Sequence, residues 1–161
     1  MKMIILALIF AAAAITAFVF INISFGRSEK FSSKEIFSFD KIKVRISGMR
    51  FTKEYEIINK GEKTEISLYN MNYSDGEEKP VLEKTAETET EEFIEFLNFC
   101  NFGNWNGFYG KHPKNVRDGI MFNITAVINN GETFRAEGSE NFPKGYRDFI
   151  KELDRLLNGG E

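Results

Sequence analysis

Cysteine, histidine and proline are scarce in this chain: its 161 residues include one Cys, one His and three Pro. A single Cys excludes an internal disulfide and any zinc site built from several cysteines. A single His excludes a multi-histidine metal site and weakens every catalytic arrangement that needs one as a base. The composition therefore predicts neither a metal nor a cofactor.

An excess of positive charge is also missing, because 21 Lys and Arg stand against 24 Asp and Glu, for a net charge of −3. Nucleic-acid binders usually carry a basic excess, so we expect no nucleic-acid partner. With 42% hydrophobic and 28% charged residues the composition is not that of a disordered chain. The length suits one globular domain.

The amino-terminal segment is the most apolar part of the chain. Residues 3–24 carry no charge, and a membrane-spanning helix needs roughly 20 apolar residues. This run is longer than the about 7–15 residues of a typical signal-peptide core, so we expect a membrane anchor, with a cleaved signal peptide and a buried helix as alternatives. The expected division is an anchor or signal at 1–26, a tether at 27–36 and one domain at 37–161.

Charges around this segment conflict over topology. Lys2 precedes the apolar run, whereas Arg27, Lys30 and Lys34 follow it, which by the positive-inside rule places the domain in the cytoplasm. A Met-Lys start before an apolar run is typical of export. We expect a cell-membrane protein whose domain faces outward, or a secreted one if the segment is cleaved.

Hydrophobic alternation predicts strands in the rest of the chain. Residues 41–47 alternate without a fault, and 50–59 and 63–71 continue a three-stranded meander. Residues 72–87 are polar, with Asp-Gly and Pro, and predict an exposed loop. Asp118-Gly119 predicts a turn into a further strand that runs to Ile128, and Asn130-Gly131, a strong hairpin signal, joins it to a strand at 132–138.

Two amphipathic segments predict helices. Thr88 and Glu91 have capping-box spacing ahead of an apolar stripe that includes Phe93 and Cys100, and Pro143 suits the first turn of a final helix. Residues 102–117 contain three Gly and Pro113 and should be irregular. We therefore expect an α+β fold in the order β-β-β-α-β-β-α: a five-stranded antiparallel sheet with two helices packed on one face, preceded by an amino-terminal transmembrane or signal helix.

The last third of the chain carries a recurrent motif. It consists of Trp105-x-Gly107-Phe108, Val116-x-Asp118-Gly119-x-x-Phe122, Asn130-Gly131, Gly138-Ser139-x-Asn141-Phe142-Pro143 and Tyr146. This pattern resembles a widespread, uncharacterised domain of exported and lipid-anchored proteins of Gram-positive bacteria. The resemblance implies an α+β fold and a bacterial envelope setting. It implies no activity and assigns no functional residue.

The aromatic and polar segment after residue 102 is the best candidate for a binding site. Trp105, Phe108 and Tyr109 stand beside Asn and Gly, and flat aromatic rings beside polar side chains can stack on sugars or anchor a protein partner. Lys111 and His112 follow in a locally basic loop, which can attract an anionic envelope polymer or a phospholipid head group. These five residues are the predicted ligand-binding site.

No convergent reactive set is visible in the sequence. Cys100 lies on an apolar helix stripe, and the Glu-rich stretch 77–95 lacks the oxygen spacing of a calcium loop. The leading hypothesis is therefore a non-catalytic, membrane-anchored envelope module that binds a polymer or protein, with its oligomeric state open. One alternative is an envelope enzyme, which requires His112, Asp118 and a second acid to converge. The other is an inhibitor or immunity-type protein.

Overall fold

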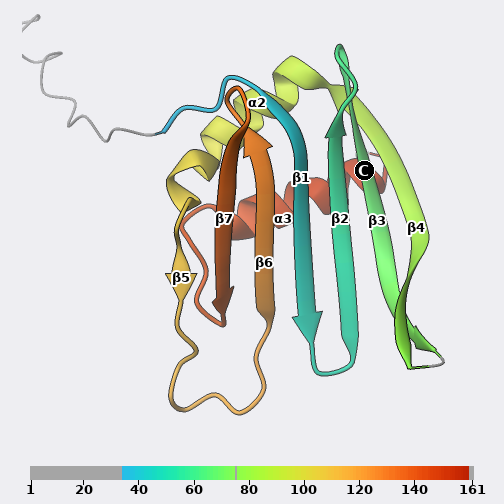
Figure 1. Ribbon diagram of the computed structural model, residues 1–161, viewed down its shortest axis with the longest axis vertical. Helices are drawn as coiled ribbons and strands as arrows, with labels where there is room; N and C mark the ends of the chain where they lie inside the picture. The colour runs from blue at the N-terminus through green and yellow to red at the C-terminus, as the bar shows by residue number, and fades with distance from the viewer. Residues whose placement is uncertain (1–33, 75, 160–161) are drawn as a thin grey trace, which may run out of the picture. The chain divides into compact units, whose positions relative to one another are not determined.

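The computed structural model describes residues 34–74 and 76–159, which form one sheet and two helices (Figure 1). The strands, in chain order, are β1 (Phe39–Gly48), β2 (Phe51–Asn59), β3 (Lys63–Ser74), β4 (Glu77–Glu89), β5 (Tyr109–Gly110), β6 (Met121–Ile128) and β7 (Glu132–Ser139). In the sheet they lie in the order β4-β3-β2-β1-β6-β7-β5. All neighbours are antiparallel except β5 and β7, which run parallel.

The expected five-stranded sheet is wrong, because the described chain forms seven strands. One missed strand is β4, which occupies most of the stretch 72–87 that was predicted to be a loop. None of its thirteen residues has a buried side chain, so β4 lacks the hydrophobic alternation that a half-buried strand shows. Its partner is the adjacent β3, and Gly76 provides a positive φ of 80° in the connecting turn.

The other missed strand is β5, a two-residue element inside the segment expected to be irregular. Its pairing of Tyr109 with Glu137 and of Gly110 with Gly138 joins residues 28 apart in sequence. Such a pairing leaves no local pattern. It gives β7 a short neighbour at the edge of the sheet and places residues 109–112 beside the ends of β6 and β7.

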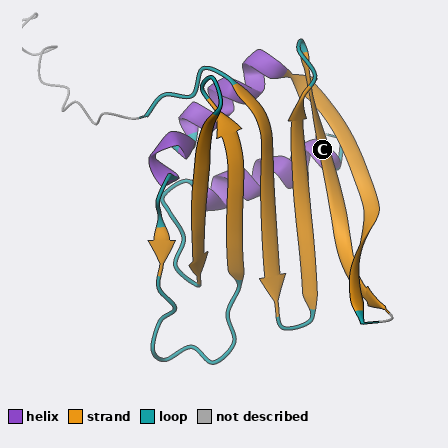
Figure 2. Cartoon of the chain, viewed as in Figure 1, coloured by secondary structure: helices purple, strands orange, loops and turns teal. Residues whose placement is uncertain are grey.

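Both helices, α2 (Thr90–Phe99) and α3 (Tyr146–Leu157), cover the same face of the sheet and leave the other open (Figure 2). The capping box is not formed, since Glu89 precedes α2 and no side chain caps its first turn. Pro143 lies before α3 and not in its first turn; its carbonyl accepts a hydrogen bond from the Tyr146 amide. The helices are therefore held by their apolar stripes more than by their caps.

An aromatic core lies between the helices and the sheet. It joins α2, the 3-10 helix η1 (Phe102–Trp105) and α3 to β6 and β7. Phe102 stacks on Phe134 with ring centroids 4.6 Å apart, and Trp105 meets Phe149 edge-on at 5.6 Å. Tyr146, on α3, adds a further ring to this layer and lies 4.7 Å from Phe122 of β6 between ring centroids.

The chain joins the domain beside the β6–β7 hairpin. Ile36, expected to lie in the tether, is 1% exposed, and both its backbone groups bond to the Asn98 side chain, at 2.8 and 2.7 Å. From there β1 runs ten residues, about 33 Å, to the far end of the sheet. No helix within residues 34–74 and 76–159 is long and apolar enough to cross a membrane. The apolar run 3–24 lies outside the described residues.

Candidate functional site

Trp105 lies in the core and not at the surface. Its side chain is 2% exposed, and its indole Nε1–H donates a hydrogen bond of 2.9 Å to the Lys144 carbonyl. The same ring packs against Phe102 and Tyr146. A ligand has no indole surface to stack on, so we leave Trp105 out of the binding surface and assign it to the core.

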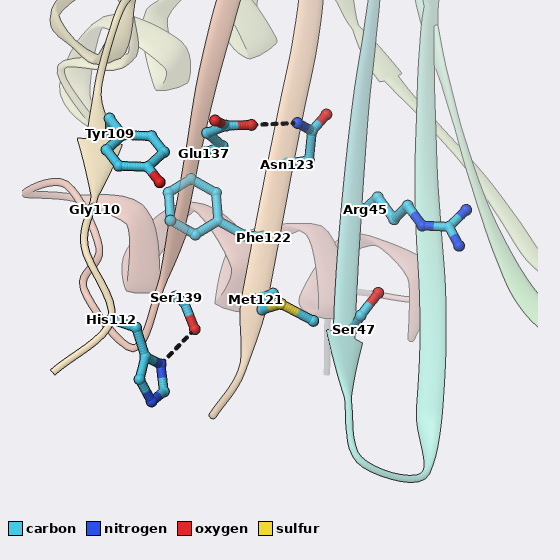
Figure 3. A pocket seen from close by; sticks show the side chains of 11 residues that line it. Arg45, Ser47, Tyr109, Gly110, His112, Met121, Phe122, Asn123, Glu137 and Ser139 are labelled. Atoms are coloured by element: carbon cyan, nitrogen blue, oxygen red, sulfur yellow. Dashed lines mark hydrogen bonds between the residues drawn. The ribbon is translucent and has the colours of Figure 1, made fainter. Parts of the chain in front are cut away.

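Phe108 and Tyr109 divide between the core and the surface. Phe108 is half-buried, with its ring centroid 6.2 Å from that of Phe122. Tyr109, the next residue, is 67% exposed on β5 and is directed over the open face of the sheet near β7 (Figure 3). Of the three aromatic residues predicted for the site, only Tyr109 offers a free ring.

His112 fastens the loop of residues 111–120 to the end of β7. Its Nε2 lies 2.7 Å from the Val116 carbonyl and its Nδ1 lies 2.8 Å from Ser139 Oγ. A carbonyl only accepts, so Nε2–H donates to the Val116 carbonyl; in that tautomer of the imidazole Nδ1 accepts a hydrogen bond from the Ser139 hydroxyl. The ring is exposed but lies at the beginning of the loop, and both of its nitrogens have protein partners.

Two glycines allow the chain segments around this site to approach closely. A Cβ built on Gly110 would lie 2.1 Å from the Asn141 carbonyl oxygen, and one on Gly138 would lie 2.6 Å from the same atom. No side chain fits at either position. The Gly138-Ser139-x-Asn141 motif therefore has a structural reason: it lets β5 and the loop after β7 pack against each other.

Three depressions join along this edge of the open face. The central one, about 400 Å³, shares Tyr109, Asn123 and Glu137 with a smaller one towards Arg135, and His112, Met121 and Ser139 with one towards Arg117. We call this continuous feature the edge groove. The side chains that line it include those of Met49, Tyr109, His112, Arg117, Met121, Asn123, Arg135, Glu137 and Ser139. Among them His112 bonds to Ser139 and Asn123 bonds to Glu137.

The basic side chains of the open face and those of the groove differ in their pairing. On β1, Lys41 pairs with Glu56, Lys43 with Glu54 at 2.8 Å, and Arg45 with both oxygens of Glu78 at 2.6 Å. Arg45 is accordingly directed away from Tyr109 (Figure 3).

Around the groove, by contrast, Lys111, Lys114, Arg117 and Arg135 are exposed and form no ion pair with any residue of 34–74 or 76–159. Their charges remain available to an anionic partner.

Several groove residues were not predicted as site residues. Ser139 and Arg117 stand in the recurrent motif or beside it, yet nothing in the sequence links them to Tyr109. Asn123 and Met121 occupy the outward positions of a predicted strand, and this alternation was the one signal that could have placed them on the open face. Asn123 Nδ2 reaches Glu137 Oε2 across β6 and β7 at 3.3 Å.

The reactive groups of the described residues form no obvious catalytic or metal centre. No cluster of three or more metal-ligating side chains occurs among them. Burial, and secondarily Asp148 and Glu152, raises the pKa of the Cys100 thiol to about 12, which keeps it protonated and inert. His112 and Asp118 line the same depression, but the hydrogen-bond partners of His112 are Ser139 and Val116.

Comparisons with known proteins add no further information. No protein-family model, no curated protein and no solved structure matches the chain. The edge groove is therefore the feature of the described residues that bears on function.

Proposed function

We propose that the protein is a membrane-tethered module of the bacterial envelope that binds a polymer or protein partner through the edge groove without catalysing a reaction. One observation carries this proposal: an exposed Tyr109 and unpaired basic side chains surround a continuous groove on an otherwise internally paired sheet face. The envelope setting of the proposal comes from the expected resemblance of about residues 105–157 to the uncharacterised domain of exported proteins.

The position of the groove suits a tethered binder. The chain joins the domain at Lys34, whose amide bonds to Asn104 and whose ammonium pairs with Glu132, the first residue of β7. Arg117 and Met49 lie at the other end of β1, where the sheet ends in the β1–β2 turn. The loop end of the groove and Lys34 therefore lie at opposite ends of β1.

The test has two parts and uses the full-length chain. Protease treatment of intact cells, followed by immunoblotting of the domain, should degrade it while it fractionates with membranes. Purified protein in detergent should then co-sediment with isolated cell walls, and Tyr109→Ala with Lys111→Ser, Lys114→Ser and Arg117→Ser should abolish this. Protection in intact cells or sedimentation unchanged by these substitutions would contradict the proposal.

A matched control separates the groove from net charge. Lys144, Arg147 and Lys151, before and on α3, are also exposed and form no ion pair among the described residues. Changing these three to Ser removes the same charge outside the groove. Sedimentation should persist in this variant.

The Ser139–His112 contact favours one second candidate, an envelope hydrolase. A hydroxyl within hydrogen-bond reach of a histidine that a third group orients is the arrangement of an activated nucleophile. Incubation with a fluorophosphonate probe tests this: covalent labelling of Ser139 that disappears in His112→Ala would support it. An unlabelled protein would leave His112 with the structural role of holding the loop.

A further inference from the structure

The composition of the edge groove indicates the chemical class of its ligand. Its centre combines one large exposed ring with hydrogen-bonding groups, and its ends carry positive charge. The three features are spread along the groove, so each can contact a different part of one extended ligand.

At the centre, Tyr109 supplies a flat surface of low conformational entropy. The Asn123 amide, the Glu137 carboxylate and the Ser139 hydroxyl lie around it on β6 and β7 (Figure 3). A ring with an apolar face and several hydroxyl groups complements this set: the face stacks on Tyr109 while the hydroxyls exchange hydrogen bonds with the polar groups. A sugar residue has this combination, and an aliphatic chain or an inorganic anion does not.

The two ends of the groove carry cations that form no ion pair within residues 34–74 and 76–159. Arg135 lines one end and Arg117 the other, with Lys111 and Lys114 in the same loop as Arg117. From Arg135 to Ser139 alone β7 rises about 13 Å, so the cations are too far apart to serve one small anion. Negative charges repeated along a chain would meet both ends at once.

The acids of the groove offset part of this positive charge, and the cations of the loop and of β7 add to it at the two ends. Glu137 lies at the centre, where its carboxylate accepts a hydrogen bond from the Asn123 side-chain amide, and Asp118 lies beside Arg117. The Glu140 carboxylate accepts a hydrogen bond from the Ile120 backbone amide. The outer cations Lys111, Lys114 and Arg135 face solvent with no acid bonded to them among the described residues.

We infer that the edge groove binds an acidic polysaccharide, with one sugar ring stacked on Tyr109 and acidic groups of the neighbouring sugars at Arg117 and Arg135. This inference rests on the proposed function and specifies the partner. The ligand needs both its acidic groups and its sugar rings: the charge gives attraction, and the stacked sugar gives orientation and specificity.

Three probes separate the contribution of charge from that of the sugar ring. Their binding to the full-length chain in detergent is measured by calorimetry. Oligogalacturonate has sugar rings and carboxylates, its methyl ester has the same rings without charge, and inorganic polyphosphate has charge without rings. Oligogalacturonate should bind at least about tenfold more tightly than either of the others, and its binding should weaken as ionic strength rises. Equal or tighter binding of polyphosphate would overturn the inference, as would the absence of oligogalacturonate binding.

Variants locate the site. Tyr109→Ala should weaken oligogalacturonate binding about tenfold, while Tyr109→Phe, which keeps the ring, should retain most of it. Arg117→Ser with Arg135→Ser should weaken it more than the control Arg147→Ser with Lys151→Ser. Equal effects of the two pairs would mean that only net charge attracts the probe and would overturn the assigned site.

This experiment fails independently of the one on cell walls. Groove-dependent sedimentation with walls, together with no binding of oligogalacturonate, would overturn the acidic polysaccharide and leave the binding module standing. If the protein neither sedimented with cell walls nor bound oligogalacturonate, the proposed function would be overturned as well.

Discussion

The two halves of the segment 102–112 have opposite roles, although both are rich in aromatic and polar residues. Phe102 to Trp105 forms a turn of 3-10 helix whose large side chains are buried between α3 and the sheet. Tyr109 to His112 lies at the surface, as a short strand and the beginning of a loop. Only a few residues separate a core element from the candidate binding surface.

This difference shows that neighbouring aromatic residues need not form one site. Asn106 and Gly107 separate the halves. The Asn106 side-chain oxygen accepts a hydrogen bond from the Arg135 backbone amide, and the Gly107 amide donates a hydrogen bond of 2.7 Å to the Arg135 carbonyl. Both contacts fix the segment on β7 where it turns from the core to the surface. Substitutions in the two halves should therefore separate stability from binding.

Trp105→Ala should have the largest effect, on stability. It removes the Nε1 hydrogen bond to Lys144 and leaves a cavity beside Phe102, Tyr146 and Phe149, at a cost of about 3–5 kcal/mol in the free energy of unfolding. Urea denaturation followed by circular dichroism measures this. A loss below about 1 kcal/mol would contradict the core assignment.

Cys100, just before the core half, provides a reporter of the same packing. Because burial raises its pKa to about 12, its native thiolate fraction at pH 8 is roughly a thousandfold below that of a free thiol. Alkylation by iodoacetamide should be much slower in the native chain than in urea, and faster in Trp105→Ala than in the native chain. Rapid alkylation of the native protein would show that the end of α2 is open.

Gly138→Ala should have an intermediate effect on stability, because Gly138 packs against Gly110 of β5, next to Tyr109. The new methyl group would lie 2.6 Å from the Asn141 carbonyl oxygen, 2.7 Å from a Phe122 ring carbon and 3.1 Å from Gly110 Cα. Backbone atoms must move, which should cost about 1–3 kcal/mol and displace β5, so ligand binding falls too. Thermal unfolding of Gly138→Ala should therefore be shifted more than that of Ser139→Ala, which adds no atom. Equal shifts would contradict the close approach.

His112→Ala should loosen the loop more than it destabilises the domain. It removes hydrogen bonds to Ser139 and Val116 at an exposed position, worth about 1 kcal/mol together in the free energy of unfolding. Hydrogen exchange should accelerate in residues 111–120 and stay unchanged in β1. Unchanged exchange in the loop would mean that other contacts hold it.

The strands that bury one face could be predicted from the sequence. The strands β4 and β5, which bury no regular face, could not be predicted. Ile42, Val44 and Ile46 alternate with charged residues because β1 is covered by helices on one side only. In β4 both faces of the first ten residues reach solvent, and β5 depends on a pairing with β7 distant in sequence. Neither strand has a periodic signature.

The candidate site was predictable only in its local part. Tyr109, Lys111 and His112 stood out because aromatic and basic residues gather within a few positions. Ser139 and Asn123 reach the groove through the register of β6 with β7, which pairs Asn123 with Glu137 and Met121 with Ser139. Tertiary packing also decides that Trp105 is buried and Tyr109 exposed. The sequence does not show this difference, so it predicts both residues as part of the site.

Tyr109→Ala should change stability least and completes the comparison with Trp105→Ala. Because Tyr109 is 67% exposed, truncation should alter the free energy of unfolding by no more than about 0.5 kcal/mol. The same change should weaken oligogalacturonate binding about tenfold, equivalent to about 1.4 kcal/mol. Denaturation and calorimetry on one preparation give both values. A stability loss near that of Trp105→Ala would return Tyr109 to the core and remove the distinction between the two halves.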